Sequence, residues 1–321
     1  MTEQNRLVVA LDDGYASYDQ ETDLLKTVGA RFELRPCGGD AQLAADAVRG
    51  ADIVLVRETP VSLPVIEAMD RCRAVIRYGI GTDNIDIGAA SARRIAVANV
   101  PDYGIDEVST HAMALLLAVA RQVVNRDREV RAGRWSAAAT RAMYRLSGRT
   151  VGLVGYGRIA RSFHDKLAGF GFSRVLVHDP HAALPDGVEA AGIDQICAEA
   201  DVISLHAPLG PATRHMIDAR RLALMKPTAI LVNTSRGGLV DLDALHAALA
   251  ARQILGAGLD VFEPEPPSAS HPAFTLDNVV VSDHIGWYSE EAMRDLQRKA
   301  AEEAVRVLAG GPPKHWLNAW Q

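Results

Sequence analysis

The chain alternates short apolar runs with segments of helical periodicity over almost its whole length. This alternation predicts parallel strands joined by helices, because a parallel connection needs a crossover of helix size. Up to residue 100 the apolar runs are 7–11, 51–56 and 74–76, with a weaker candidate at 29–36. After residue 149 there are six more, at 151–154, 175–177, 202–205, 229–232, 258–261 and 279–281. We therefore predict an α/β fold with two doubly wound parallel sheets.

Two helical segments frame the second block. Residues 106–133 are expected to form one long helix between the two blocks, and residues 290–309 a last helix that returns to cover the first block. The net charge of −6 argues against a general nucleic-acid binder. The apolar stretch 112–120 is too short to span a membrane, and the three cysteines have no metal-ligand spacing. We expect a cytoplasmic protein without a metal site.

A glycine-rich turn follows the apolar run 151–154. Its motif runs from Gly155 through Gly157 to Ala160, and a helical segment comes next. In this context the first glycine permits a tight turn, the second lets the backbone approach a pyrophosphate, and the helix start favours phosphate. Asp179 ends the following strand, where a carboxylate can bind the ribose hydroxyls of NAD. The alternative interpretation of Asp179 is a turn residue before Pro180.

Three further polar residues are expected at the carboxyl edge of the same sheet. Arg236, Glu265 and His284 each follow a different predicted strand. An arginine can bind a carboxylate and polarise a carbonyl group, and a histidine can exchange a proton near neutral pH. A glutamate can orient the imidazole and favour its charged form. Each residue alone could belong to an ordinary turn, loop or core, but the set suits hydride transfer to a 2-oxo acid.

The first block has a comparable edge. Arg57 and Arg77 end two of its predicted strands, and the glycines after Tyr78 could expose backbone N–H groups that hold a carboxylate. The alternative is a plain strand–helix turn with solvated arginines.

Together these segments resemble the D-isomer-specific 2-hydroxyacid dehydrogenases over nearly the whole chain. The resemblance rests on residues 77–86, 150–161, 225–241, 256–267 and 284–286. It implies a Rossmann cofactor domain inserted into a flavodoxin-like substrate domain, with a cleft between them. The expected bounds are 1–100 and 288–321 for the substrate domain and 101–287 for the cofactor domain. The resemblance also implies a homodimer formed through the cofactor domain.

The resemblance assigns roles residue by residue. It implies that Arg236 binds substrate and that Glu265 and His284 form the acid/base pair. Tyr78 and Gly79 match the loop whose amides hold the substrate carboxylate, and Arg57 and Arg77 are added as substrate contacts. The remaining positions are expected to bind NAD: Gly155, Gly157, Arg158, Ile159, Asp179, Ala207, Pro208, Thr213, Thr234, Ser235, Asp260, His284 and Gly286.

Some positions depart from the usual family pattern. Ala160 replaces the commoner third glycine, and Asp283 stands before His284 where proline is usual. The segments 100–108 and 284–292 look like the branch that contains the C-terminal-binding corepressors, in which the tryptophan at Trp287 lines the substrate pocket. The main hypothesis is an NAD-dependent oxidoreductase acting on a small 2-hydroxy or 2-oxo acid. The alternatives are a 3-phosphoglycerate-type dehydrogenase and an NAD-sensing, corepressor-like scaffold.

Overall fold

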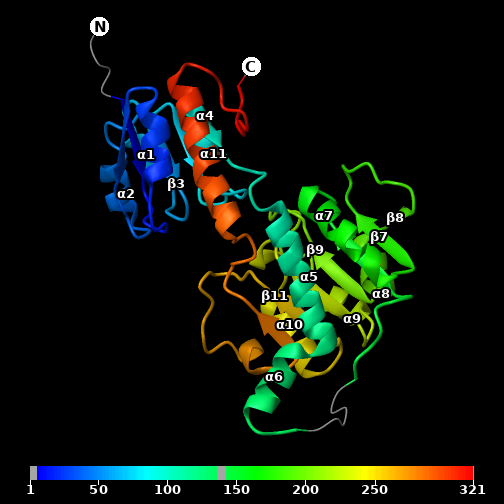
Figure 1. Ribbon diagram of the computed structural model, residues 1–321. Coiled ribbons are helices and arrows are strands. Elements are labelled where there is room, and N and C mark those ends of the chain that lie inside the picture. The colour runs from blue at the N-terminus through cyan, green and yellow to red at the C-terminus, as the bar shows by residue number, and fades with distance from the viewer. Residues whose placement is uncertain (1–5, 136–141, 321) are drawn as a thin grey trace. The chain divides into compact units, whose positions relative to one another are not determined.

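The protein is described by a computed structural model that covers residues 6–135 and 142–320. The chain divides into two compact units. The first unit comprises Met1–Gly104 and Ser289–Gln321, and the second unit comprises Ile105–Tyr288. Figure 1 colours them along the chain, so that red α11 at the end of the sequence lies with the blue elements of the beginning.

The first unit contains a five-stranded, fully parallel sheet with the order β2-β1-β3-β4-β5. This is the strand order of flavodoxin-like folds. Its strands are β1 (Arg6–Ala10), β2 (Ala30–Leu34), β3 (Ile53–Val56), β4 (Ala74–Arg77) and β5 (Ala96–Ala98). Its helices are α1 (Asp19–Lys26), α2 (Ala41–Ala47), α3 (Leu63–Glu67), α4 (Ile87–Ala92) and α11 (Glu290–Leu308).

Helices cover the first sheet from two sides. The returning helix α11 packs along α1 and reaches β3 and β4 (Figure 1). Helices α2, α3 and α4 pack on one another, and their apolar residues share a core with Val9, Val54 and Val75. Every residue of β3 is buried, which explains its uninterrupted apolar sequence.

The second unit contains a seven-stranded parallel sheet with the order β12-β11-β10-β9-β6-β7-β8. Its strands are β6 (Thr150–Val154), β7 (Arg174–His178), β8 (Val188–Ala190), β9 (Val202–Leu205), β10 (Ile230–Asn233), β11 (Gly256–Leu259) and β12 (Val279–Val281). Its α-helices are α5 (Ile105–Arg121), α6 (Val123–Arg131), α7 (Arg158–Leu167), α8 (Ile193–Glu199), α9 (Ala219–Leu224) and α10 (Leu242–Ala250). Three 3-10 turns complete it: η1 (Ala168–Phe170), η2 (Gly237–Leu239) and η3 (Pro272–Thr275).

The core of the second unit has two halves, one on each face of the sheet. On one face α5 and α7 pack together (Figure 1). Their residues Leu116 and Phe163 share a core with strand residues such as Val151. On the other face α8, α9 and α10 cover residues that include Ile203 and Leu231. The expected doubly wound parallel sheets are therefore confirmed.

The structure differs from the sequence-based expectation in four places. The short strands β5 and β8 were not predicted: β5 has the sequence Ala-Val-Ala, and β8 is a largely exposed edge strand interrupted by Glu189. The helix expected over 106–133 is broken at Gln122, whose left-handed backbone (φ 54°) separates α5 from α6. Strand β11 begins and ends two residues earlier than predicted, which places Asp260 directly after it.

The described part of the chain has no helix that is both long and apolar enough to cross a membrane.

We expect the core contact of α5 to be essential for the stability of the second unit. Leu116 is fully buried, so Leu116→Ala should lower the free energy of unfolding by about 2–5 kcal/mol, measured by urea denaturation. The matched control is Leu224→Ala in α9, where the side chain is 40% exposed and the loss should stay below about 1 kcal/mol. Equal losses for the two variants would contradict the packing described above.

Candidate active site

The turn after β6 is shaped to receive a ligand backbone group. Gly155 has a left-handed φ of 87°, and a Cβ there would lie 2.7 Å from the backbone carbon of His206. Gly157 is exposed and caps α7, and a Cβ there would point into open space. Arg158 and Ile159 form the first turn of α7, while Ala160 is fully buried against the sheet. The free N–H groups of this helix start therefore face an open surface suited to phosphate.

Asp179 lies directly after β7, beside this turn. Its carboxylate accepts hydrogen bonds from the backbone N–H of Tyr156 (2.7 Å), His181 (2.9 Å) and Ala182 (3.1 Å). Partial burial acts to raise the pKa of Asp179, but these hydrogen bonds outweigh it and hold the pKa below its ordinary value. The side chain is thus a fixed anion next to the glycine turn.

The loops after β9 and β10 are bonded to each other. The hydroxyl of Ser235 donates to the carbonyl of Ala207 (2.6 Å) and joins the two loops. Within the loop after β9, the hydroxyl of Thr213 donates to the carbonyl of Pro208 (2.8 Å). The hydroxyl of Thr234 is buried and has no hydrogen-bond partner among the described residues. Such an orphaned donor, on the same sheet edge as the open turn at Gly157 and the fixed Asp179, fits a polar dinucleotide bound along this edge.

The three predicted catalytic residues belong to this same edge. Glu265 Oε2 and His284 Nδ1 lie 2.6 Å apart, and Glu265 Oε1 accepts the backbone N–H of Phe262 (2.9 Å). Partial burial acts to raise the pKa of Glu265, but the bonds from His284 and Phe262 and the charge of Arg236 hold it below its ordinary value. The structure therefore brings an ionised carboxylate, an imidazole and a guanidinium within electrostatic reach of one another.

Asp260 holds the segment that carries His284. Its buried carboxylate accepts from the hydroxyl of Ser282 (2.6 Å) and from the backbone N–H of Ile285 (3.1 Å) and Gly286 (2.9 Å). A Cβ on Gly286 would lie 2.8 Å from the Asp260 carboxylate, so the loop can approach this closely only with glycine there. Asp283, which departs from the usual pattern, is exposed.

In the first unit, Arg57 follows β3, and Arg77 is the last residue of β4. The Arg77 guanidinium donates to the carbonyl of Tyr78 and lies against Gly79. The N–H of Tyr78 donates to Val56 (2.8 Å), and its buried hydroxyl donates to Glu21 (2.9 Å). Both donors of Tyr78 are thus committed within this unit, so the geometry favours Gly79 for holding a carboxylate.

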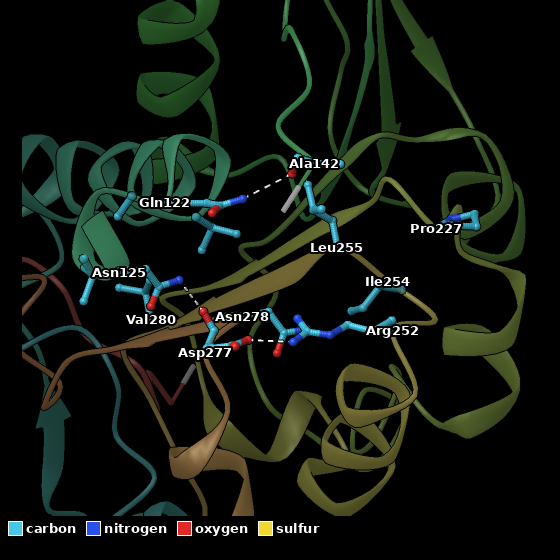
Figure 2. A pocket seen from close by; sticks show the side chains of 13 residues that line it. Gln122, Asn125, Ala142, Pro227, Arg252, Ile254, Leu255, Asp277, Asn278 and Val280 are labelled. Atoms are coloured by element: carbon cyan, nitrogen blue, oxygen red, sulfur yellow. Dashed lines mark hydrogen bonds and ion pairs between the residues drawn. The ribbon is translucent and has the colours of Figure 1, made fainter. Parts of the chain in front are cut away.

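A cavity of about 320 Å³ lies at the other end of the second sheet (Figure 2). Pro227, Leu255 and Asn278 line it, and these residues come just before β10, β11 and β12. The candidate catalytic residues come after those strands, so this cavity is separate from the candidate active site. Among the described residues, no group of three or more histidine, cysteine or acidic side chains is arranged to hold a metal ion.

Comparison with known proteins agrees with this arrangement. Residues 113–286, more than half of the chain, match the family model described as D-isomer specific 2-hydroxyacid dehydrogenase, NAD binding domain. The chain belongs to this family. The match assigns an NAD-type cofactor to the second unit, where the glycine turn, Asp179 and Thr234 lie.

Individual relatives cover both units. The chain is 40% identical over 273 residues to a glyoxylate reductase of Korarchaeum cryptofilum, covering 83% of this chain and 82% of that protein. It is 39% identical over 279 residues to a D-3-phosphoglycerate dehydrogenase of Methanocaldococcus jannaschii, covering 85% of this chain but only 53% of that protein. The chain thus spans about half the length of this second relative. A solved Thermus thermophilus protein, named TT0316, has a TM-score of 0.89 and 33% identity, covering 97% of this chain and 99% of that one.

Two polar residues of this region were not singled out from the sequence. His111 in α5 reaches Ser282 across 171 positions of sequence, and the partly buried His206 bonds the hydroxyl of Ser204 (2.9 Å) behind the glycine turn. Burial lowers the pKa of His206 to about 4, so its ring is neutral. No short motif marks either residue. The partner of His111 comes near only through the packing of distant elements, whereas that of His206 lies two positions before it. Trp287, expected in the substrate pocket, is half-buried with its ring edge-on to Tyr288.

We expect Asp179 to set a preference for NADH over NADPH, because its fixed negative charge would repel the 2′-phosphate. Asp179→Ala should reduce the ratio of the two dissociation constants by at least about tenfold, equivalent to about 1.4 kcal/mol. Binding can be followed by the fluorescence of the reduced cofactors. The control Asp186→Ala removes an exposed carboxylate nearby in sequence and should change the ratio less than about twofold. Equal affinity of the parent protein for both cofactors would refute the assignment.

Proposed function

We propose that the protein is an NAD-dependent D-2-hydroxyacid dehydrogenase that interconverts a small 2-oxo acid and the corresponding D-2-hydroxy acid. The observation that carries the proposal is the 2.6 Å pairing of Glu265 with His284 on the sheet edge that also carries Arg236 and the glycine turn. An acid/base pair and an anion-binding guanidinium beside a dinucleotide site are the groups that this reaction needs.

Each of the three side chains has a distinct task in the proposed mechanism. Arg236 binds the substrate carboxylate and polarises the C2 carbonyl with its planar donor fork. The His284 Nδ1 atom is engaged by Glu265, so its Nε2 atom exchanges the proton with the substrate oxygen. The glycine turn, Asp179 and Thr234 would hold the cofactor, which when bound would supply or accept the hydride at C2. The ionised Glu265 stabilises the imidazolium that gives up its proton during reduction.

A second candidate function is oxidation of a phosphorylated hydroxy acid, as the name of the Methanocaldococcus relative indicates. Arg57 favours this function, because a cation beside the predicted substrate loop can bind a second anionic group. Its guanidinium carbon lies 5.8 Å from the centre of the Tyr15 ring, which packs against Tyr78 of that loop. Its charge is shared with Glu58, whose carboxylate lies 2.7 Å away and would compete with a second anionic group. We therefore rank this second function below the reduction of an unphosphorylated 2-oxo acid.

The deciding experiment is NADH oxidation with glyoxylate, pyruvate, longer 2-oxo acids and 3-phosphohydroxypyruvate. Turnover of an unphosphorylated 2-oxo acid at the highest kcat/KM supports the main proposal. Preference for the phosphorylated substrate would favour the second candidate. Tight NADH binding without turnover of any of them would contradict both and favour the corepressor-like scaffold, in which Trp287 would line a ligand pocket without turnover.

We also propose that the protein is a homodimer formed through the second unit. None of the described residues of α6 is buried, Val123 and Val130 are 56% and 53% exposed, and the following Trp135 is 88% exposed. Such apolar exposure on one helical segment supports a protein contact there.

The three cysteines are free thiols, which supports the expected cytoplasmic location.

Arg236→Lys should lower kcat/KM, because lysine keeps the charge but not the two-donor fork. The expected loss of transition-state stabilisation is about 2–4 kcal/mol. The NADH dissociation constant should change less than about threefold. Arg214→Lys is the control, because Arg214 forms an exposed ion pair with Glu263 and is assigned no catalytic role. Near-normal kcat/KM in Arg236→Lys would remove Arg236 from the proposed mechanism.

Glu265→Gln should move both pH–rate profiles to lower pH. The lowered pKa of Glu265 keeps it anionic throughout the neutral range, so it stabilises the charged imidazole there. Without that anion the charged form of His284 loses this stabilisation. The alkaline limb of kcat/KM for reduction, which needs charged His284, therefore moves down. The acidic limb for oxidation, which needs neutral His284, moves the same way. Limbs that stay in place or move upward would exclude the role given to Glu265.

A further inference from the structure

His111 joins helix α5 to the loop that carries His284. Its side chain is 23% exposed, and its Nε2 atom lies 2.7 Å from the Ser282 hydroxyl oxygen and 3.3 Å from Asp260 Oδ1. Both partners follow strands of the same sheet, whereas His111 comes from a helix on one face of it. The contact therefore links the helix layer to the catalytic edge.

The direction of these hydrogen bonds follows from the available protons. The Ser282 hydroxyl has one proton and donates it to Asp260, whose ionised carboxylate can only accept. The Ser282 oxygen must therefore accept from His111, which requires the His111 proton on Nε2. The resulting chain runs from His111 through Ser282 to the buried carboxylate of Asp260 without a donor–donor or acceptor–acceptor conflict.

Asp260 also holds the backbone of His284 and of the two residues that follow it. Asp260 accepts the N–H groups of Ile285 and Gly286, while its own backbone carbonyl accepts the N–H of His284 (2.8 Å). His284 has a left-handed φ of 57°, a conformation that non-glycine residues hold only when their surroundings impose it. The orientation of its ring toward Glu265 thus depends on the anchoring of this loop.

We propose that His111 is a positioning residue for the reaction: through Ser282 and Asp260 it holds residues 282–286 so that His284 is correctly placed against Glu265. The inference rests on the proposed function for its catalytic consequence, but the hydrogen-bond chain itself can be tested without turnover. His111 touches neither His284 nor Glu265 in this role, and it acts only through the loop.

Two amide replacements separate this role from simple packing. His111→Gln places a donor near the position of Nε2, whereas His111→Asn is one methylene shorter and places it near Nδ1. We expect kcat for 2-oxo acid reduction to remain within about threefold in the glutamine variant and to fall at least about tenfold in the asparagine variant, since small displacements of reacting groups lower rates steeply. In a Ser282→Ala background, His111→Asn should cause little further loss, because the link is already absent.

Histidine-labelled protein provides the readout that does not need activity. In 1H–15N spectra of the imidazole groups, His111 should be protonated on Nε2, and the His284 signals should match in the parent and His111→Gln. In His111→Asn the His284 signals should shift or broaden. If the parent protein turns over no 2-oxo acid, the proposed function is refuted, but the positioning role of His111 is not. Identical His284 signals in all three proteins, a His111 ring without a proton on Nε2, or equal kcat in the two amide variants would overturn the positioning role.

Discussion

The parallel register of the second sheet is the constraint on which the candidate active site depends. One row of paired residues crosses six of its strands: His178, Val154, Leu205, Asn233, Leu259 and Val281. The residues that directly follow this row are Asp179, Gly155, His206, Thr234, Asp260 and Ser282. Hydrogen-bond register alone therefore aligns the carboxylate of Asp179, the glycine turn, the Thr234 hydroxyl that has no partner among the described residues and the Asp260 anchor of the His284 loop along one edge. A slip of a single residue in any strand would move its contribution out of this line.

The carboxylates on this edge share a second feature, which is that hydrogen bonds keep them charged despite burial. Asp179, Asp260 and Glu265 each accept backbone N–H groups, and each has a pKa below its ordinary value. Burial alone would act in the opposite direction and favour the neutral acids. The negative charges on this edge are thus paired with hydrogen-bond donors of the protein itself. In the proposed mechanism Arg236 provides the positive charge for a substrate anion, so anionic groups of the protein and of a ligand can occupy the same edge.

The sequence predicted what depends on local pattern. Parallel strands are marked by continuous apolar runs, so six of the seven strands of the second unit were found, and the residues after them became site candidates. What depends on tertiary approach was missed. The edge strand β8 is short, largely exposed and interrupted by Glu189, and the break at Gln122 has no glycine or proline to mark it. The assignment of His111 needed the contact with Ser282, and the commitment of both Tyr78 donors needed the contacts with Val56 and Glu21.

The loop around His284 shows how local strain and long-range contacts combine. Its left-handed backbone is unfavourable for histidine, and Gly286 leaves too little room for any side chain beside Asp260. The loop is stable because one carboxylate collects the N–H groups on its far side and the hydroxyl on its near side. Helix α5, which begins the second unit at Ile105, is tied through His111 to the loop that ends three residues before Ser289, where the chain returns to the first unit. The segments by which the chain enters and leaves the second unit are therefore bonded to each other, and His284 lies in the loop that this bond anchors.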